Sequence, residues 1–150
     1  MKHSNSGTCP KCFDIISKYP GFYEPLGQWF FSFQKAHPEA HISCAGRGRD
    51  DQETLFQSRR SRAHYGESAH NWNAALDIWE NSGDLHKIYE KLWFIDILQP
   101  ALPSWIEWYG RAGAAFSELP HIQPNNWKRL RDSGLLALVE PLEEDEIKWP

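Results

Sequence analysis

A short alternating run, ALDIWE at residues 75–80, limits the folds that this chain can adopt. Side chains alternate between the two faces of a strand, so Asp77 shares one face with Ala75 and Trp79. Burying an aspartate beside these apolar side chains is costly unless another group pairs with its carboxylate. The run therefore predicts a sheet strand whose Asp77 meets a partner from elsewhere in the chain.

The rest of the chain alternates irregularly between helical and extended patterns. Apolar spacing and breaker residues predict helices over 11–19, 25–37, 49–62, 82–102 and 125–134, and strands over 40–46, 105–110 and 119–123. Gly134 is expected to stop the last helix. Because the strands lack a regular β-α-β rhythm, we expect an α+β fold with a small, mostly antiparallel sheet flanked by helices.

Composition is that of one ordinary globular domain over residues 1–150, ending in an acidic tail at about 139–150. The net charge of −4 argues against a nucleic-acid partner. No apolar run approaches the roughly 20 residues of a membrane span, and the N-terminal MKHSNSGTCPKCF has no apolar signal region. We expect a monomer made in the cytoplasm, without stable membrane insertion.

The three cysteines are an odd number and do not form a disulfide framework. Cys9 and Cys12 make a CPKC pair, and HISC supplies His41 and Cys44, so a four-ligand structural zinc site is conceivable. Reduced thiols are the alternative, with Cys44 as a buried strand residue.

Two histidines stand near acidic residues in patterns that suit metal chemistry. His70 precedes Asp77 in SAHNWNAALD, and His121 follows Glu118 in FSELPHIQ. Two imidazoles and one carboxylate can hold a catalytic zinc whose fourth ligand is water. Zinc lowers the pKa of that water toward ~7, and an unliganded carboxylate such as Glu118 can accept its proton. An arginine in the segment 47–49 would stabilise an oxyanion.

Each of these residues also has an ordinary structural explanation. A loop histidine is commonly a hydrogen-bonded surface residue. Asp77 would then cap a turn, and Glu118 would be a solvated acid. Spacing alone leaves both interpretations open.

The segment SAHNWNAALD resembles the S-x-H-x-x-G-x-A-x-D signature of the zinc D-alanyl-D-alanine carboxypeptidase and L-alanyl-D-glutamate endopeptidase family, which includes many phage endolysins. Ser68, His70, Ala75 and Asp77 match that signature, and Asn73 stands where the family usually has glycine. Glycine permits a positive φ, and asparagine is the next most tolerant residue. We therefore expect the loop to keep its geometry.

Two further segments resemble the same family in the same order. ELPHIQ is similar to its second signature, in which an acid stands two residues before a Pro-His pair that an apolar residue and Glu or Gln follow. AGRGRDDQETLF is similar to the segment that carries the substrate-binding arginine. Register against Gln52 and Leu55 favours Arg47 for that role, with Arg49 as the alternative.

The resemblance implies a Hedgehog/DD-peptidase-like fold and a set of roles. It implies that His70, Asp77 and His121 bind Zn²⁺ and that Glu118 activates water. It implies that Arg47 steadies the substrate and that Ser68 orients a ligand or contacts substrate. Three tryptophans either wall the cleft or pack in the core: Trp72, Trp79 and Trp108.

The activity implied is hydrolysis of a peptide bond in the stem peptide of bacterial peptidoglycan, in the manner of a compact phage endolysin. Such an enzyme accumulates in the host cytoplasm and reaches the wall through a pore made by another protein. A D-alanyl-D-alanine carboxypeptidase is the alternative within the class. A non-catalytic wall-binding module, stabilised by zinc, is the alternative from another class.

Overall fold

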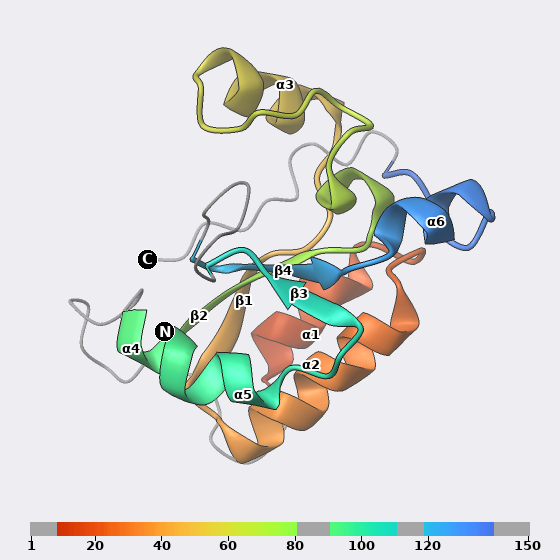
Figure 1. Cartoon of the computed structure of the whole chain (residues 1–150). Coiled ribbons are helices and arrows are strands. Elements are labelled where there is room, and N and C mark those ends of the chain that lie inside the picture. Colours follow the sequence, from red (N-terminus) through yellow and green to blue (C-terminus); the bar gives the residue numbers. More distant parts are fainter. Residues whose placement is uncertain (1–8, 81–90, 111–118, 140–150) are drawn as a thin grey trace.

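A four-stranded antiparallel sheet organises the computed structural model, which describes residues 9–80, 91–110 and 119–139 (Figure 1). The strands are β1 (Ala40–Cys44), β2 (Leu76–Glu80), β3 (Ile106–Trp108) and β4 (His121–Pro124), in the order β1-β2-β4-β3. Figure 1 shows α1 and α2 below the sheet and α3 on the other side. The predicted α+β class with an antiparallel sheet is confirmed.

The helices follow most of the expected ranges. They are α1 (Pro10–Ser17), α2 (Glu24–Ala36), α3 (Arg49–Gln57), the 3₁₀ turn η1 (Ala69–Trp72), α4 (Lys91–Trp93), the π-helical turn η3 (Phe94–Leu98), α5 (Gln99–Ala101) and α6 (Trp127–Asp132). Within the described ranges, none combines the length and the apolar character that a bilayer crossing requires.

The main core fills the space between the helices and the sheet. Phe30 and Leu26 of α2 and Ile15 of α1 are buried with strand residues such as Ile42 and Ile78. Burying each such side chain contributes about 1.5–3 kcal/mol. This packing makes the sheet a rigid base for the polar groups on its other face.

The apolar residues of segment 91–101 are not all buried. Leu92 and Ile95 are 60% and 37% exposed, whereas Phe94 and Leu98 are fully buried. The run LWFIDIL is apolar on every side, so its periodicity does not identify one face. A π-helical turn over Phe94–Leu98 further shifts the side chains out of the 3.6-residue period.

Strand pairing places polar residues opposite one another at the centre of the sheet. Asp77 of β2 pairs with His121 of β4. An irregularity between Ile42 and Cys44 of β1 brings Cys44 opposite Asp77 as well. Bulges of this kind re-aim a side chain and are common beside functional sites.

Candidate metal centre

Three side chains from distant parts of the sequence converge on one point. His70 Nε2 lies 3.1 Å from both Asp77 Oδ1 and His121 Nδ1. His121 Nδ1 lies 3.3 Å from Asp77 Oδ1. The exposed fractions of His70, Asp77 and His121 are 1%, 8% and 4%. The structure thus brings together the three residues predicted as metal ligands, and their role stays a prediction.

The spacing of the three atoms agrees with tetrahedral zinc coordination. Ligand atoms about 2.0–2.1 Å from a tetrahedral zinc ion lie about 3.3 Å from one another. The separations here are 3.1, 3.1 and 3.3 Å. Two imidazoles and a carboxylate also form a donor set typical of catalytic zinc. The residues present therefore fit this ion.

Hydrogen bonds on the far side of each imidazole fix which nitrogen faces the cluster. His70 Nδ1 lies 2.7 Å from the Ala45 carbonyl oxygen, so Nδ1 is the donor and Nε2 keeps its lone pair. His121 Nε2 lies 2.7 Å from Gln123 Oε1, which leaves the Nδ1 lone pair toward the cluster. Gln123 Nε2 in turn donates to Glu107 Oε1 at 2.8 Å. Partners of this kind orient metal ligands in proteins.

Gln123 and Glu107 were not singled out as site residues from the sequence. The available signal was strand alternation, which places residues 121 and 123 on the same face of β4. Glu107 needed the tertiary structure, because its position opposite Gln123 follows from the pairing of β3 with β4.

The electrostatics favour a neutral imidazole beside an anionic carboxylate. Burial lowers the pKa of His70, and the nearby Arg47 charge lowers it further against the opposing effect of Asp77. Burial alone would raise the pKa of Asp77, but His70 and His121 outweigh it and hold that pKa well below its usual value. Metal ligands must be in these protonation states.

The turn that carries His70 is capped at its start by two side chains and ends at Asn73. Ser68 Oγ accepts a hydrogen bond from the His70 backbone N–H at 3.2 Å, and Asn71 Oδ1 accepts from the Ser68 backbone N–H at 3.1 Å. Asn73 ends the turn with φ 57° and ψ 35°. The positive φ expected where the family has glycine is confirmed. Ser68 thus acts on His70 through the backbone.

Arg47 is the arginine that reaches the cluster. Its Nη2 lies 3.7 Å from Asp77 Oδ2, and its Nη1 donates to Gln52 Oε1 at 3.2 Å. Arg49 instead places its guanidinium 5.3 Å from the centre of the Tyr65 ring. The positive charge of Arg47 is therefore buried beside the Asp77 carboxylate, and Gln52 of α3 holds the guanidinium in place.

The three tryptophans considered for the cleft occupy different environments. Trp108 is buried in the main core and stacks on Phe94, with ring centres 6.2 Å apart. Trp79 is buried with its ring centre 5.4 Å from that of His41. Trp72 is half-buried against a smaller apolar cluster. Trp108 and Trp79 are thus core residues, which was the alternative to lining the cleft.

Cys44 also borders the cluster. Its Sγ lies 3.8 Å from His70 Nδ1, and Cys44, His70 and Asp77 offer ligand atoms within 4.8 Å of one another. The nitrogen nearest to the sulfur is the one directed at the Ala45 carbonyl. We therefore take His121 rather than Cys44 as the third member of the cluster.

Glu118, the predicted base, lies outside the described residues. The chain directly after it is hydrogen-bonded to two neighbouring strands. The Leu119 carbonyl accepts a hydrogen bond from Trp108 Nε1 at 2.6 Å, and the Pro120 carbonyl accepts from the Ile78 backbone N–H at 2.9 Å. These bonds attach the segment before His121 to β2 and β3.

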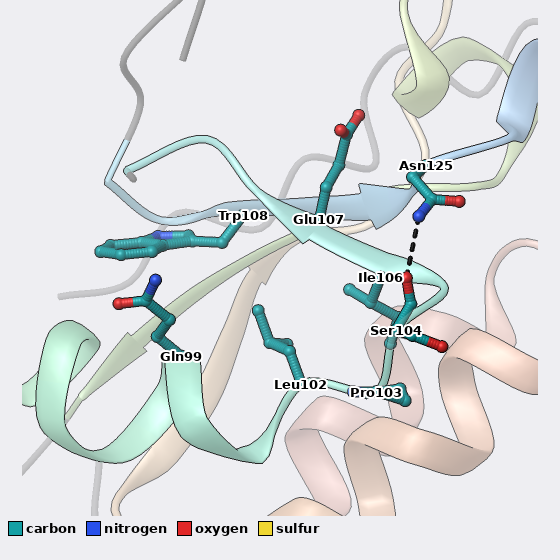
Figure 2. A pocket seen from close by; sticks show the side chains of 8 residues that line it. All are labelled: Gln99, Leu102, Pro103, Ser104, Ile106, Glu107, Trp108 and Asn125. Atoms are coloured by element: carbon teal, nitrogen blue, oxygen red, sulfur yellow. Dashed lines mark hydrogen bonds between the residues drawn. The ribbon is translucent and has the colours of Figure 1, made fainter. Parts of the chain in front are cut away.

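A separate hollow of about 400 Å³ lies along β3 (Figure 2). Figure 2 shows Leu102, Pro103 and Ile106 on one side of the strand and the Glu107 carboxylate pointing to the other side. The Glu107 side chain is the link to the cluster, through Gln123. The hollow is therefore a neighbour of the metal centre and not its cleft.

Comparison with known proteins identifies the fold. No family model matches the sequence, and no curated protein matches it. The structure is similar to the crystal structure of Serratia marcescens L-Ala D-Glu endopeptidase ChiX, with a TM-score of 0.61 and 15% sequence identity over 83% of this chain and 90% of that chain. At this identity the similarity establishes the peptidase-like fold alone.

Proposed function

We propose that this protein is a zinc-dependent peptidase that hydrolyses the stem peptide of bacterial peptidoglycan, as a phage endolysin of the L-alanyl-D-glutamate endopeptidase type. The observation that carries the proposal is the convergence of His70 Nε2, Asp77 Oδ1 and His121 Nδ1 at 3.1–3.3 Å, the edge length of a tetrahedral zinc site. The substrate class is supported by the family resemblance and by the fold of the ChiX endopeptidase.

Zinc bound here supplies a Lewis acid and a water of lowered pKa. The chain's own residues prepare the site for it. Ala45 and Gln123 hold the two imidazoles in the tautomers that direct their lone pairs inward. Burial keeps His70 neutral, so a proton does not compete for its Nε2.

Arg47 contacts the substrate in this proposal. Its guanidinium lies 3.7 Å from Asp77 Oδ2, at the cluster, and the resemblance gives it the role of steadying the substrate carbonyl or its oxyanion. Glu118 accepts the proton of the attacking water, the role that the resemblance gives it. General-base catalysis of this kind contributes about 10²–10⁴-fold in rate.

The test is hydrolysis of purified peptidoglycan, with the released muropeptides identified by mass spectrometry. We expect activity that a chelator abolishes and added zinc restores. New L-alanine or D-glutamate termini identify the endopeptidase, whereas released D-alanine identifies the carboxypeptidase alternative. Binding to the wall without any cleavage, at full zinc content, would favour the non-catalytic module and contradict the proposal.

Glu118→Ala tests the base separately from the metal. This variant is expected to hold as much zinc as the wild-type protein and to lose hydrolysis by at least about 10²-fold. Asp132→Ala, which removes an exposed acid of α6, is the matched control and should keep full activity. Undiminished hydrolysis by Glu118→Ala would remove this residue from the mechanism.

The biological setting follows from the same proposal. We propose that the enzyme acts as a monomer, accumulates in the host cytoplasm and meets the wall after another protein opens the membrane. Expression in a bacterial host with and without a pore-forming protein tests this setting, with lysis expected only when both proteins are present.

A further inference from the structure

A second group of metal-binding side chains lies apart from the first. Cys9, Cys12 and His41 offer ligand atoms that are all within 4.8 Å of one another. Their exposed fractions are 1%, 0% and 2%. Cys44 is not among them and instead borders the first cluster, so the four-ligand set considered from the sequence is wrong in that member.

The two cysteines and the histidine come from different elements. Cys9 stands at the N-cap of α1 and Cys12 lies in its first turn, while His41 belongs to β1, 29 residues after Cys12. The Cys12 Sγ and His41 Nδ1 atoms are 3.7 Å apart. In a tetrahedral zinc site with bonds of about 2.3 Å to sulfur and 2.0–2.1 Å to nitrogen, this separation is about 3.6 Å.

The sulfur of Cys12 is surrounded by donors. The Ile42 backbone N–H points at it from the edge strand β1 at 3.3 Å, and Gln34 Nε2 points at it from α2 at 3.5 Å. Hydrogen bonds from N–H groups stabilise a sulfur that carries negative charge, and metal ligands commonly have such partners. An apolar core position does not require them.

Gln34 joins the elements around this cluster. Its Oε1 accepts a hydrogen bond from the Cys9 backbone N–H at 3.0 Å, and its Nε2 donates to the Ala40 carbonyl at 2.8 Å. These two hydrogen bonds therefore fix the start of α1 and the edge of β1 relative to the buried amide of Gln34 on α2. The cluster is held in place by residues that are not themselves ligands.

We infer that Cys9, Cys12 and His41 form a second metal site, which binds zinc for a structural purpose and ties α1 to the outer edge of β1. Two thiolates and an imidazole select zinc over magnesium or calcium, which prefer oxygen ligands. The site anchors the strand that leads into Ala45 and Arg47, two residues at the first cluster. The described residues thus supply three of the four ligands of a tetrahedral zinc site.

A redox role for the CPKC pair fits the geometry less well. Both sulfurs are buried, and exchange with another thiol requires access to one of them. All three cysteines of the chain are reduced in the structure.

The stoichiometry of bound zinc separates the two sites. Asp77→Asn disables the first cluster, so this full-length variant is expected to retain about one zinc per chain by elemental analysis, and adding Cys12→Ser should remove it. An Asp77→Asn protein without zinc would overturn the second site. Hydrolysis of peptidoglycan is a separate readout, so failure of the proposed function is distinguishable.

Cobalt(II) spectroscopy of the wild-type protein does not depend on whether cysteine variants fold. Cobalt bound to the wild-type protein is expected to show a sulfur-to-metal charge-transfer band that persists in Cys44→Ala and disappears in His41→Asn and Cys9→Ser. Absence of the band in the wild-type protein, or its loss only in Cys44→Ala, would contradict the inference. So would recovery of Cys9 and Cys12 as a disulfide from protein saturated with zinc.

Discussion

Single residues set the local geometry of the candidate site. Asn73 adopts a left-handed backbone conformation with φ 57°, which ends the turn that carries His70. Its side chain also donates to the Ala137 carbonyl at 2.8 Å. The residue thus combines a backbone conformation suited to glycine with a hydrogen bond that glycine lacks.

Two substitutions at this position separate those contributions. Asn73→Gly and Asn73→Ala both lose the hydrogen bond to Ala137, but only alanine meets the steric cost of a positive φ, about 1–2 kcal/mol. We expect Asn73→Ala to have the lower free energy of unfolding by about 1 kcal/mol in chemical denaturation. Equal stability of the two variants would contradict the backbone argument.

Gln123 provides a test of how the metal ligand His121 is oriented. Gln123→Leu removes the acceptor 2.7 Å from His121 Nε2, and we expect the affinity of the first cluster for zinc to fall about 10–100-fold. Gln123→Glu combined with Glu107→Gln keeps the acceptor for His121 and the hydrogen bond between positions 123 and 107, and should bind zinc almost as tightly as the wild-type protein. Competition with a chromophoric chelator measures both affinities, and equal weakening in the two variants would exclude an orienting role.

At the scale of elements, two helices end in the same way with different residues. In α6, Gly134 has φ 78°, Leu135 N–H bonds to the Leu130 carbonyl and Gly134 N–H to that of Arg131. In α3 the corresponding left-handed position is Arg59, with φ 62°. Both ends are Schellman motifs. The predicted stop at Gly134 is confirmed. The predicted helix 49–62 ends at Gln57, five residues early, and the sequence did not reveal this end because no glycine marks it.

The α3 end predicts a stabilising substitution. Arg59→Gly relieves the left-handed strain and should raise the free energy of unfolding by about 0.5–1 kcal/mol. Arg60→Gly, one residue later, is the matched control and should lower it, because φ there is not positive. Thermal or chemical unfolding measures the stability of both variants. Destabilisation of Arg59→Gly by as much as Arg60→Gly would contradict the left-handed conformation assigned to Arg59.

At the scale of the whole molecule, the candidate site exists only when the sheet is assembled. His70 and His121 are 51 residues apart in sequence, yet their nitrogens are 3.1 Å apart. Both lie beside Asp77, so the folded state buries two imidazoles and a carboxylate together. The protonation states of these groups therefore couple to folding.

Acid is expected to destabilise the metal-free protein through this coupling. The folded-state pKa of His70 is lowered, so below pH ~6.5 the unfolded chain takes up a proton that the folded chain does not. The free energy of unfolding in chelator should fall from pH 7 to 5, by at most about 1.4 kcal/mol per pH unit for one proton. Asp77, whose pKa is also lowered, loses its contribution only at much lower pH.

The variant His70→Asn serves as the reference for this measurement. It lacks the titrating imidazole, so its stability should depend less steeply on pH between 7 and 5. Parallel curves for the two proteins would show that another group causes the acid dependence.

The amino-acid sequence by itself determined the local features of this protein. Alternation placed Asp77 on one face of a strand with Ala75 and Trp79, the loop residue Asn73 adopted its expected positive φ, and Gly134 stopped its helix. These features depend on steric and hydrogen-bonding preferences within a few residues. They could therefore be predicted without knowledge of any distant contact.

Only the tertiary structure decided which distant residues meet. The register of β2 against β4 places Asp77 opposite His121. The irregularity in β1 places Cys44 opposite Asp77, beside the first cluster, while His41 lies with Cys9 and Cys12. Local periodicity does not encode strand register or the face that an all-apolar helix buries. Both are settled by packing and by the pairing of backbone groups far apart in sequence.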